Sequence, residues 1–449
     1  MTDYQTFIGS KTEAIKEAGL QVQQDDLNAK LFGYQKDVVE WALNRGRAAI
    51  FADCGMGKTP MQLEWANKIP GRVLIAAPLA VAAQTVREAA KFNIEGAAYL
   101  REDDRQTPIV VTNYEMLEKF DPAQFAGVVL DESSILKSYT GKFKQHIIQE
   151  WGQVEYRLAC TATPAPNDFM ELGNHSEFLG VQTGSEMLSS FFINDPGNVG
   201  KYRLKGHGEG KFWDWMSQWA VMLKKPSDLG YSDEGFTLPP LNIEEHVVDP
   251  NKPPEGLLFA LDAHTMQERL TARRSSVEER VKHVAEIVNQ DSSAQWLIWC
   301  NLNAESEMLN KSIPDSVQVQ GSDSLDKKTD RLLGFADGKY RILISKPRIA
   351  GFGMNFQGCH NMAFTGLSDS FEQYYQAVRR CWRFGQTKPV NVHVVTARTE
   401  GAVVANIRRK EEQAKKLSDS MAGRLNKTHA AKFTQPYQPK NQIKTPSFL

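Results

Sequence analysis

The sequence is poor in cysteine, and the few cysteines it has lie far apart along the 449 residues. They form neither a disulfide framework nor the Cys-x-x-Cys spacing of a metal site. The five positions are Cys54, Cys160, Cys300, Cys359 and Cys381. This usage excludes a small disulfide-stapled secreted domain and is typical of a protein from a reducing compartment.

Long apolar runs and an excess of one charge are also missing. No stretch approaches the roughly 20 apolar residues of a membrane-spanning helix, and the polar start MTDYQTFIGS is unlike a signal peptide. The 53 basic and 54 acidic side chains leave a formal net charge of −1, which excludes a histone-like polycation. A net charge near zero does not exclude nucleic-acid binding, because binding depends on a local patch of Lys and Arg. We expect a cytoplasmic protein without a membrane partner.

What the sequence does have is an alternation of short β-rich apolar runs with longer amphipathic stretches. This pattern predicts parallel sheets with crossover helices, an α/β fold. The expected strands are Ala48–Ala52, Arg72–Ala77, Ile109–Thr112, Val128–Asp131 and Arg157–Cys160, then Trp296–Cys300, Val317–Val319, Arg341–Lys346, Asn361–Thr365 and Asn391–Thr396.

Between the two series lies a proline-rich stretch, which ends helices and central strands and so reads as a connector. We therefore predict an N-terminal domain over 1–225 with a helical lead-in over 1–30, a connector over 226–275 and a C-terminal domain over 276–420. Residues 421–449 are polar and contain three prolines, which predicts a loosely held tail that could contact a protein partner.

The strongest local signal is the segment 52–59, Ala-Asp-Cys-Gly-Met-Gly-Lys-Thr, directly after an expected strand. Gly55 and Gly57 would let backbone N–H groups converge on phosphate oxygens at a helix N-terminus. Lys58 would neutralise the β- and γ-phosphates, and the Thr59 hydroxyl would ligate Mg²⁺. The plainer alternative is a glycine-rich turn that opens an ordinary helix.

Two further signals follow at the ends of later strands. Asp131 and Glu132 come after the apolar run Gly127–Leu130, where Asp131 could hold Mg²⁺ through water and Glu132 could position or deprotonate the attacking water. Thr161-Ala162-Thr163-Pro164 could relay the state of the nucleotide through its hydroxyls. Taken alone, the first segment would more often be a helix cap and the second a capped turn. Their order after a phosphate loop favours the chemical interpretation.

This series resembles the core of the superfamily-two helicases and translocases, and within it the Swi/Snf-type ATPases. The matching segments, in the order of the family's motifs, are Leu31–Gln35, Lys58–Thr59, Ala76–Pro78, Asp131–Glu132, Thr161–Pro164, Gly351–Gln357 and Gln376–Gln386. The resemblance covers about residues 30–400.

The resemblance implies two RecA-like parallel-sheet domains in tandem, with ATP and Mg²⁺ in the cleft between them. It implies that Tyr34, Gln35, Gly353 and Gln376 join the glycines in binding ATP, and that Thr161 and Thr163 couple the site to the rest of the domain.

The arginines of the last matching segment also have a physical interpretation. Arg380 and Arg383 are spaced i, i+3, which would place them on one face of a helix. Two guanidinium groups there could stabilise charge on the transferring phosphoryl group, as arginine fingers do. A solvated basic helix is the plainer alternative.

Three positions depart from the subfamily pattern. Ser134 stands where the relatives usually carry His or Asp, Ala162 stands where they carry Gly, and Arg379 stands where they carry Asp. None of the three is an expected phosphate ligand. Together with the absence of recognisable chromatin-reading domains, they suggest a divergent, minimal form of bacterial or phage origin.

In this superfamily the nucleic acid is held largely through its phosphates. The candidates here are Pro78, Asn113, Lys137 and Lys346, with Tyr114, Lys144 and Arg348 beside them. Trp213, Trp215 and Trp219 could stack bases, but their helical spacing favours burial. We therefore expect an ATP-dependent translocase on double-stranded DNA. A strand-separating DNA or RNA helicase and an ATP-gated nucleic-acid-binding scaffold are the alternatives.

Overall fold

The computed structural model describes residues 19–137, 141–194, 202–249, 271, 273–350 and 355–429. Within them the chain divides into two compact units. The first runs to Asp53, resumes over Gly57–Ser232 and takes up the chain again from Leu417; the second holds Cys54–Met56 and Asp233–Lys416. Each unit is built on its own parallel sheet, so the predicted α/β class with two RecA-like domains is confirmed.

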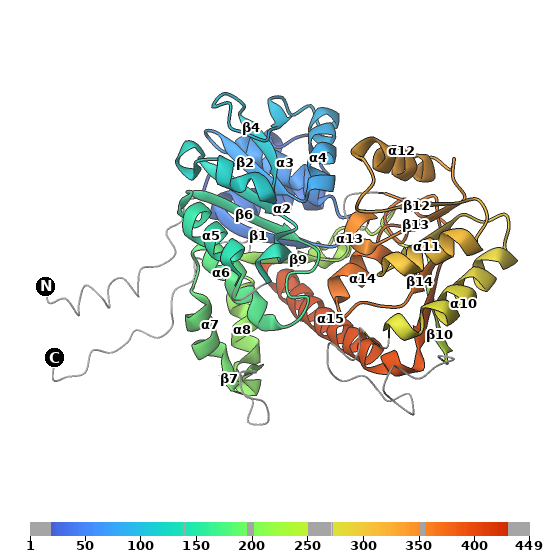
Figure 1. The fold of residues 1–449 in the computed structure, drawn as a ribbon. Coiled ribbons are helices and arrows are strands. Elements are labelled where there is room, and N and C mark those ends of the chain that lie inside the picture. Colours follow the sequence, from blue (N-terminus) through green and yellow to red (C-terminus); the bar gives the residue numbers. More distant parts are fainter. Residues whose placement is uncertain are drawn as a thin grey trace, which may run out of the picture. The chain divides into compact units, whose positions relative to one another are not determined.

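The first unit has a seven-stranded sheet in the order β3-β4-β2-β5-β6-β1-β9, with every neighbouring pair parallel (Figure 1). Its strands are β1 (Arg47–Ala52), β2 (Val73–Ala77), β3 (Ala97–Tyr99), β4 (Ile109–Asn113), β5 (Gly127–Asp131), β6 (Tyr156–Thr161) and β9 (Ala220–Leu223). The helices of this unit are α2 (Gly33–Arg45), α3 (Lys58–Lys68), α4 (Leu79–Lys91), α5 (Lys142–Glu150), α6 (Leu172–Leu179), α7 (Gly184–Phe191) and α8 (Glu209–Met216). A small antiparallel pair, β7 (Phe192–Asn194) and β8 (Tyr202–Leu204), lies apart from the main sheet.

This strand order positions the candidate site. Strands β5, β6 and β1 are consecutive neighbours in the sheet, and all three run parallel. Their carboxyl ends therefore meet at one edge, which brings the segment after Ala52, the pair Asp131–Glu132 and Thr161 side by side. Ligands of open parallel sheets bind at this edge.

The second unit has a six-stranded parallel sheet in the order β10-β15-β14-β11-β13-β12. Its strands are β10 (Leu241–Val248), β11 (Trp296–Cys300), β12 (Ser316–Val319), β13 (Ile342–Ser345), β14 (Asn361–Thr365) and β15 (Val390–Ala397). The helices are α10 (Val277–Gln290), α11 (Asn303–Ser312), α12 (Leu325–Ala336), α13 (Pro347–Ala350), α14 (Phe371–Val378) and the start of α15 (Gly401–His429).

All ten expected strands are present, with bounds that differ by at most one residue at each end. The structure adds β3, β9 and β10 to the two parallel sheets, and the small antiparallel pair β7 and β8. Of these, β10 lies in the stretch expected to be a connector, so that stretch supplies an edge strand of the second sheet. In the described part of the expected helical lead-in, residues 19–30, the helical element is the single 3₁₀ turn Gln24–Asp26.

The C-terminal stretch differs more from the prediction. Helix α15 continues through Met421 to His429, and Met421 is completely buried in the core of the first unit together with Leu417. Val403 and Ile407, near its start, belong to the core of the second unit. The expected polar tail from 421 therefore begins as packed helix; residues 430–449 lie outside the described ranges.

The tryptophan-rich segment is core. Trp213, Trp215 and Trp219 are each at most 4% exposed and pack with Phe212 in the core of the first unit. The rings of Trp215 and Trp219 meet edge to face, with their centroids 5.2 Å apart. Burial in the core, the interpretation favoured by their spacing, is confirmed.

Candidate nucleotide-binding site

The glycine-rich loop joins β1 to α3. Gly55 and Gly57 both have positive φ angles, 92° and 75°. Residues other than glycine adopt such backbone angles only with strain. A Cβ on Gly57 would lie 2.2 Å from the Nε2 atom of Gln35, so the loop backbone and this side chain are in close approach. The loop is thus a tight glycine turn directly before a helix N-terminus, the arrangement that binds phosphate.

Lys58 and Thr59 open helix α3. The Lys58 ammonium donates a hydrogen bond to the carbonyl oxygen of Ala52, 2.8 Å away, so the side chain folds back over the loop it follows. A phosphate entering the loop would exchange this carbonyl for a charged oxygen, which is the stronger partner. Thr59 is partly exposed in the first helical turn.

Asp131 ends β5 and is buried, with 3% of its surface exposed. Its Oδ1 atom accepts hydrogen bonds from the Gln62 side-chain amide at 2.7 Å and from the backbone N–H of Glu132 at 3.1 Å. Burial and the neighbouring Glu132 raise the pKa of Asp131 to about 6, although Gln62 and Lys58 act in the opposite direction. A buried carboxylate that is costly to ionise fits a divalent cation, whose charge would favour the ionised form.

We expect Mg²⁺-dependent nucleotide binding to weaken as the pH falls through about 6, by up to about tenfold per pH unit below the pKa of Asp131. The reason is that protonation of Asp131 removes a metal ligand. The measurement is ATP affinity between about pH 5 and pH 7.5, with Mg²⁺ and with a chelator. An equal pH dependence without Mg²⁺ would contradict it.

The same raised pKa has a consequence for the ligand-free chain. Because the folded state disfavours ionisation of Asp131, the stability that this shift contributes is present at low pH and is lost as the pH rises through about 6. Mg²⁺ binding would therefore favour the ionised form of the Asp131 carboxylate, and acid favours its protonated form.

Glu132 follows Asp131 with a φ of 54°, in the left-handed region that a non-glycine residue rarely adopts. Strained backbone of this kind persists where the surroundings hold it, and it gathers at functional sites. The Glu132 carboxylate accepts a hydrogen bond of 3.2 Å from the hydroxyl of Thr161, and that hydroxyl also accepts from the backbone N–H of Thr163. Of the two expected coupling threonines, Thr161 thus contacts the expected general base directly, and Thr163 contacts Thr161 through its backbone N–H.

Three supporting residues were missed by the sequence analysis or given another role there. Gln62 orients Asp131, and its place four residues after Lys58, on the same helix face, was the available signal. Tyr114, considered for nucleic acid, is buried, and its hydroxyl donates to the Asp131 carbonyl oxygen at 2.6 Å. His175 lies 3.1 Å from the Ser133 hydroxyl, and burial lowers its pKa to about 4, so it is neutral near pH 7. Nothing local in the sequence pointed to that histidine.

The first of the segments that match the family, Leu31–Gln35, leads into helix α2. The side-chain oxygen of Gln35 accepts a hydrogen bond from the backbone N–H of Phe32 at 3.0 Å. The side-chain NH₂ group of Gln35 donates to the Tyr34 hydroxyl at 3.3 Å. Tyr34 itself is 2% exposed, and burial raises its pKa, so its ring is a core element beside the site. Phe32, with 52% of its surface exposed, presents an apolar ring at the same helix start.

In the second unit, Gln376 lies on α14 and holds the first expected finger arginine. The Arg380 guanidinium donates to the side-chain oxygen of Gln376 at 2.8 Å and to its backbone carbonyl at 3.2 Å. Helix α14 ends at Val378, so the expectation that Arg380 and Arg383 share a helix face is wrong; both lie in the turns that follow. Burial and the charge of Arg380 lower the pKa of Arg383 to about 10, so Arg383 remains cationic near neutrality. Gly353 lies outside the described residues.

The candidates for nucleic-acid contact differ in how much surface they offer. Pro78 precedes α4 and is partly exposed, as are Lys137 and Lys346; the Lys346 ammonium donates to Asn303 at 2.7 Å. Asn113 is 4% exposed, and its amide is bonded to Glu115 and Tyr99. Lys144, 7% exposed, contacts Asn174. A strand could reach these last two only after their present contacts break.

No helix among the described residues combines the length and the apolar character needed to cross a bilayer.

Comparison with known proteins agrees with this geometry. Residues 279–385 match the helicase conserved C-terminal domain. The DNA annealing helicase and endonuclease ZRANB3 of Mus musculus is 21% identical over 427 residues, which cover 83% of this chain and 39% of that protein. The TATA-binding protein-associated factor mot1 of Aspergillus fumigatus is 30% identical over 123 residues, 25% of this chain and 6% of that protein. The chain thus spans well under half the length of these relatives.

Among solved structures, a fragment of a putative HsdR subunit of a type I restriction enzyme from Vibrio vulnificus YJ016 superposes with a TM-score of 0.54. The match has 13% identity and covers 89% of this chain and 70% of that one, a likeness of fold. The Sulfolobus solfataricus SWI2/SNF2 ATPase core in complex with dsDNA gives a TM-score of 0.43 with 16% identity over 92% of this chain and 97% of that one.

Proposed function

We propose that this chain, which has a superfamily-two helicase core of the Swi/Snf type, hydrolyses ATP on double-stranded DNA and uses the energy to move along the duplex. The observation that carries the proposal is the arrangement at one edge of the first sheet. There a glycine-rich loop with Lys58 lies beside a buried Asp131 and a Glu132 bonded to Thr161. That set combines phosphate binding, a metal ligand and a general base.

The residues present fit Mg-ATP. The loop N–H groups and Lys58 would hold the phosphates, and Asp131 with Thr59 would hold Mg²⁺, which neutralises charge on the phosphates. The Glu132 carboxylate would orient and deprotonate the attacking water, with Thr161 fixing its position. Gln35, whose side chain approaches Gly57, and the exposed ring of Phe32 at the start of the same helix would contact the adenine base.

We assign the arginines of the second unit to the same reaction. Arg380 is buried and already held by Gln376, and together with the half-buried Arg383 it would stabilise charge on the transferring phosphoryl group. Hydrolysis would then need both units, so a cycle of ATP binding and product release would be coupled to motion. Phosphate contacts through residues such as Lys137 and Lys346 would make DNA binding tolerant of sequence, as a translocase requires.

The test is steady-state ATPase activity with duplex DNA, single-stranded DNA, RNA and no nucleic acid. We expect duplex DNA to stimulate turnover at least about tenfold, the effect of lowering the barrier by about 1.4 kcal/mol. Lys58→Ala serves as the blank, because it lacks the phosphate-binding ammonium. Displacement of a triplex-forming strand by the wild type then measures movement along the duplex.

The other outcomes assign the alternatives. A preference for single strands, with unwinding of a tailed duplex, would replace the translocase by a strand-separating helicase. Slow ATP turnover that no nucleic acid stimulates would contradict both and favour an ATP-gated scaffold.

A further inference from the structure

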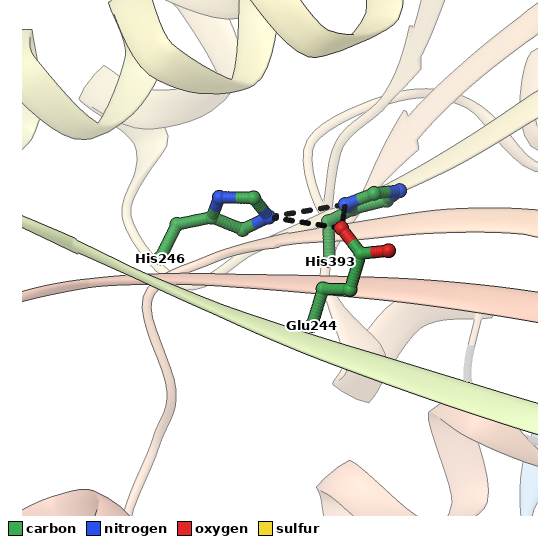
Figure 2. Close-up of side chains that lie close together, drawn as sticks. All are labelled: Glu244, His246 and His393. Atoms are coloured by element: carbon green, nitrogen blue, oxygen red, sulfur yellow. Dashed lines mark hydrogen bonds and ion pairs between the residues drawn. The ribbon is translucent and has the colours of Figure 1, made fainter.

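A cluster of metal-binding side chains lies in the second unit on the edge of its sheet, and the site chemistry above does not use it. Glu244 and His246 are two residues apart on β10, so they face the same side of the strand. His393 is paired with Glu244 in register on the neighbouring parallel strand β15. Figure 2 shows that the three side chains converge above these two strands.

The distances between the donor atoms match those around a single ion. His246 Nε2 lies 3.1 Å from His393 Nδ1, the Glu244 Oε2 atom lies 3.4 Å from His393 Nδ1, and it lies 3.9 Å from His246 Nε2. Ligands about 2.1 Å from a tetrahedral zinc ion are about 3.4 Å from one another. The three atoms therefore approximate one face of such a tetrahedron without rearrangement of the backbone.

The surroundings favour ligation by neutral imidazoles. Helix α10 brings His283 over the cluster, with its ring centroid 4.9 Å from that of His246, and its Nε2 atom is buried without a hydrogen-bond partner. The centroid of the Trp296 indole ring lies 5.6 Å from the centroid of the His393 imidazole ring. Burial and the neighbouring histidines lower the pKa values of His246 and His393, while Glu244 opposes the shift.

Access and charge also fit. The side chains of His246 and His393 are 24% and 15% exposed, and that of Glu244 is 63% exposed, so an ion can enter from solvent on the carboxylate side. Two imidazoles and one carboxylate are a ligand set that zinc uses in proteins, and they leave a fourth position for water.

We propose that Glu244, His246 and His393 form a Zn²⁺ site that joins the edge strand β10 to β15. The ion would hold in place the strand through which the chain enters the second sheet, since β10 follows closely after the start of this unit at Asp233. The site is distinct from the nucleotide-binding residues, so the proposal does not rest on the proposed function.

The test is Zn²⁺ binding to the full chain, freed of any affinity tag, stripped with a chelator and kept in excess Mg²⁺ so that Asp131 is not the site measured. We expect one tight equivalent in competition with a chromophoric chelator. His246→Gln and His393→Gln should each lower the affinity by more than about tenfold. Co²⁺ in place of Zn²⁺ should give the visible absorption of tetrahedral coordination.

His360→Gln is the matched control, because His360 is also a half-buried histidine of the second unit but lies outside the cluster. It should keep the tight equivalent. Equal Zn²⁺ affinity in the wild type and in a His246→Gln/His393→Gln double variant would overturn the proposal and leave a hydrogen-bonded histidine pair. An octahedral Co²⁺ spectrum in the wild type would overturn it as well, and that readout does not depend on the folding of any variant.

Discussion

Glu132→Gln is expected to lower the rate of ATP hydrolysis by about 10²–10⁴-fold while ATP binding persists. Glutamine keeps the shape and can still accept the hydrogen bond from Thr161, but it cannot take a proton from water. The loss therefore isolates the chemical step. The measurement is kcat in steady state together with the affinity for a fluorescent ATP analogue.

Two variants frame that result. Glu118→Gln removes an exposed carboxylate in the same unit and should leave kcat unchanged. Lys58→Ala should lose nucleotide affinity as well as turnover, because in the proposed site its ammonium would contact the phosphates in the ground state. Glu132→Gln with a kcat within about twofold of the wild type would exclude Glu132 as the general base, whatever its backbone strain.

The parts of the fold that could be predicted are those whose signal is local. Strands β11 and β14 are five-residue buried runs, and their predicted bounds match the structure. The edge strand β10 could not be predicted in the same way. Its outward residues Ile243, Glu245 and Val247 are exposed, and prolines at 240 and 250 flank it, so apolar periodicity is absent where only one long edge is paired.

The site divides along the same line. Lys58, Asp131 and Glu132 could be predicted as site residues because each lies in a segment that follows a strand and has a side chain of the type that phosphate chemistry needs. Gln62 and Tyr114 act by orienting Asp131, one through its side chain and one through its backbone. Such contacts exist only once β5 is flanked by β2 and β6 in a folded sheet, so the sequence carries little trace of them. The turns that hold Arg380 were missed because helix spacing continues past the point where α14 ends.

The second large effect concerns stability, and it comes from a buried ion cluster in the second unit. Arg280 on α10 is fully buried and donates to Glu305 at 2.6 Å; its Nε atom lies 3.6 Å from Glu400, which also pairs with Arg273. Two cations and two carboxylates thus balance one another out of reach of water. Arg273 is itself only 6% exposed within this cluster.

Glu305→Ala is expected to destabilise the second unit by about 3–5 kcal/mol, because it leaves the charge of Arg280 under-compensated where water cannot solvate it. It also removes the acceptor of the backbone N–H groups of Asn301 and Leu302 at the start of α11. The measurement is the urea unfolding midpoint of the transition assigned to this unit. Glu245→Ala breaks an exposed glutamate–arginine pair with the same 2.6 Å separation and should shift the midpoint little.

A double variant separates the charge from the contacts. Arg280→Met with Glu305→Gln removes both charges and keeps a side-chain oxygen for the two N–H groups, so it should be less destabilised than the sum of its single variants. Additive losses would mean that Arg280 and Glu305 stabilise the unit independently, through packing and hydrogen bonds. A midpoint for Glu305→Ala equal to that of Glu245→Ala would mean that water reaches the cluster. Because the Arg280–Glu305 and Arg408–Glu245 pairs are equally close, such a result would contradict the burial of the first pair.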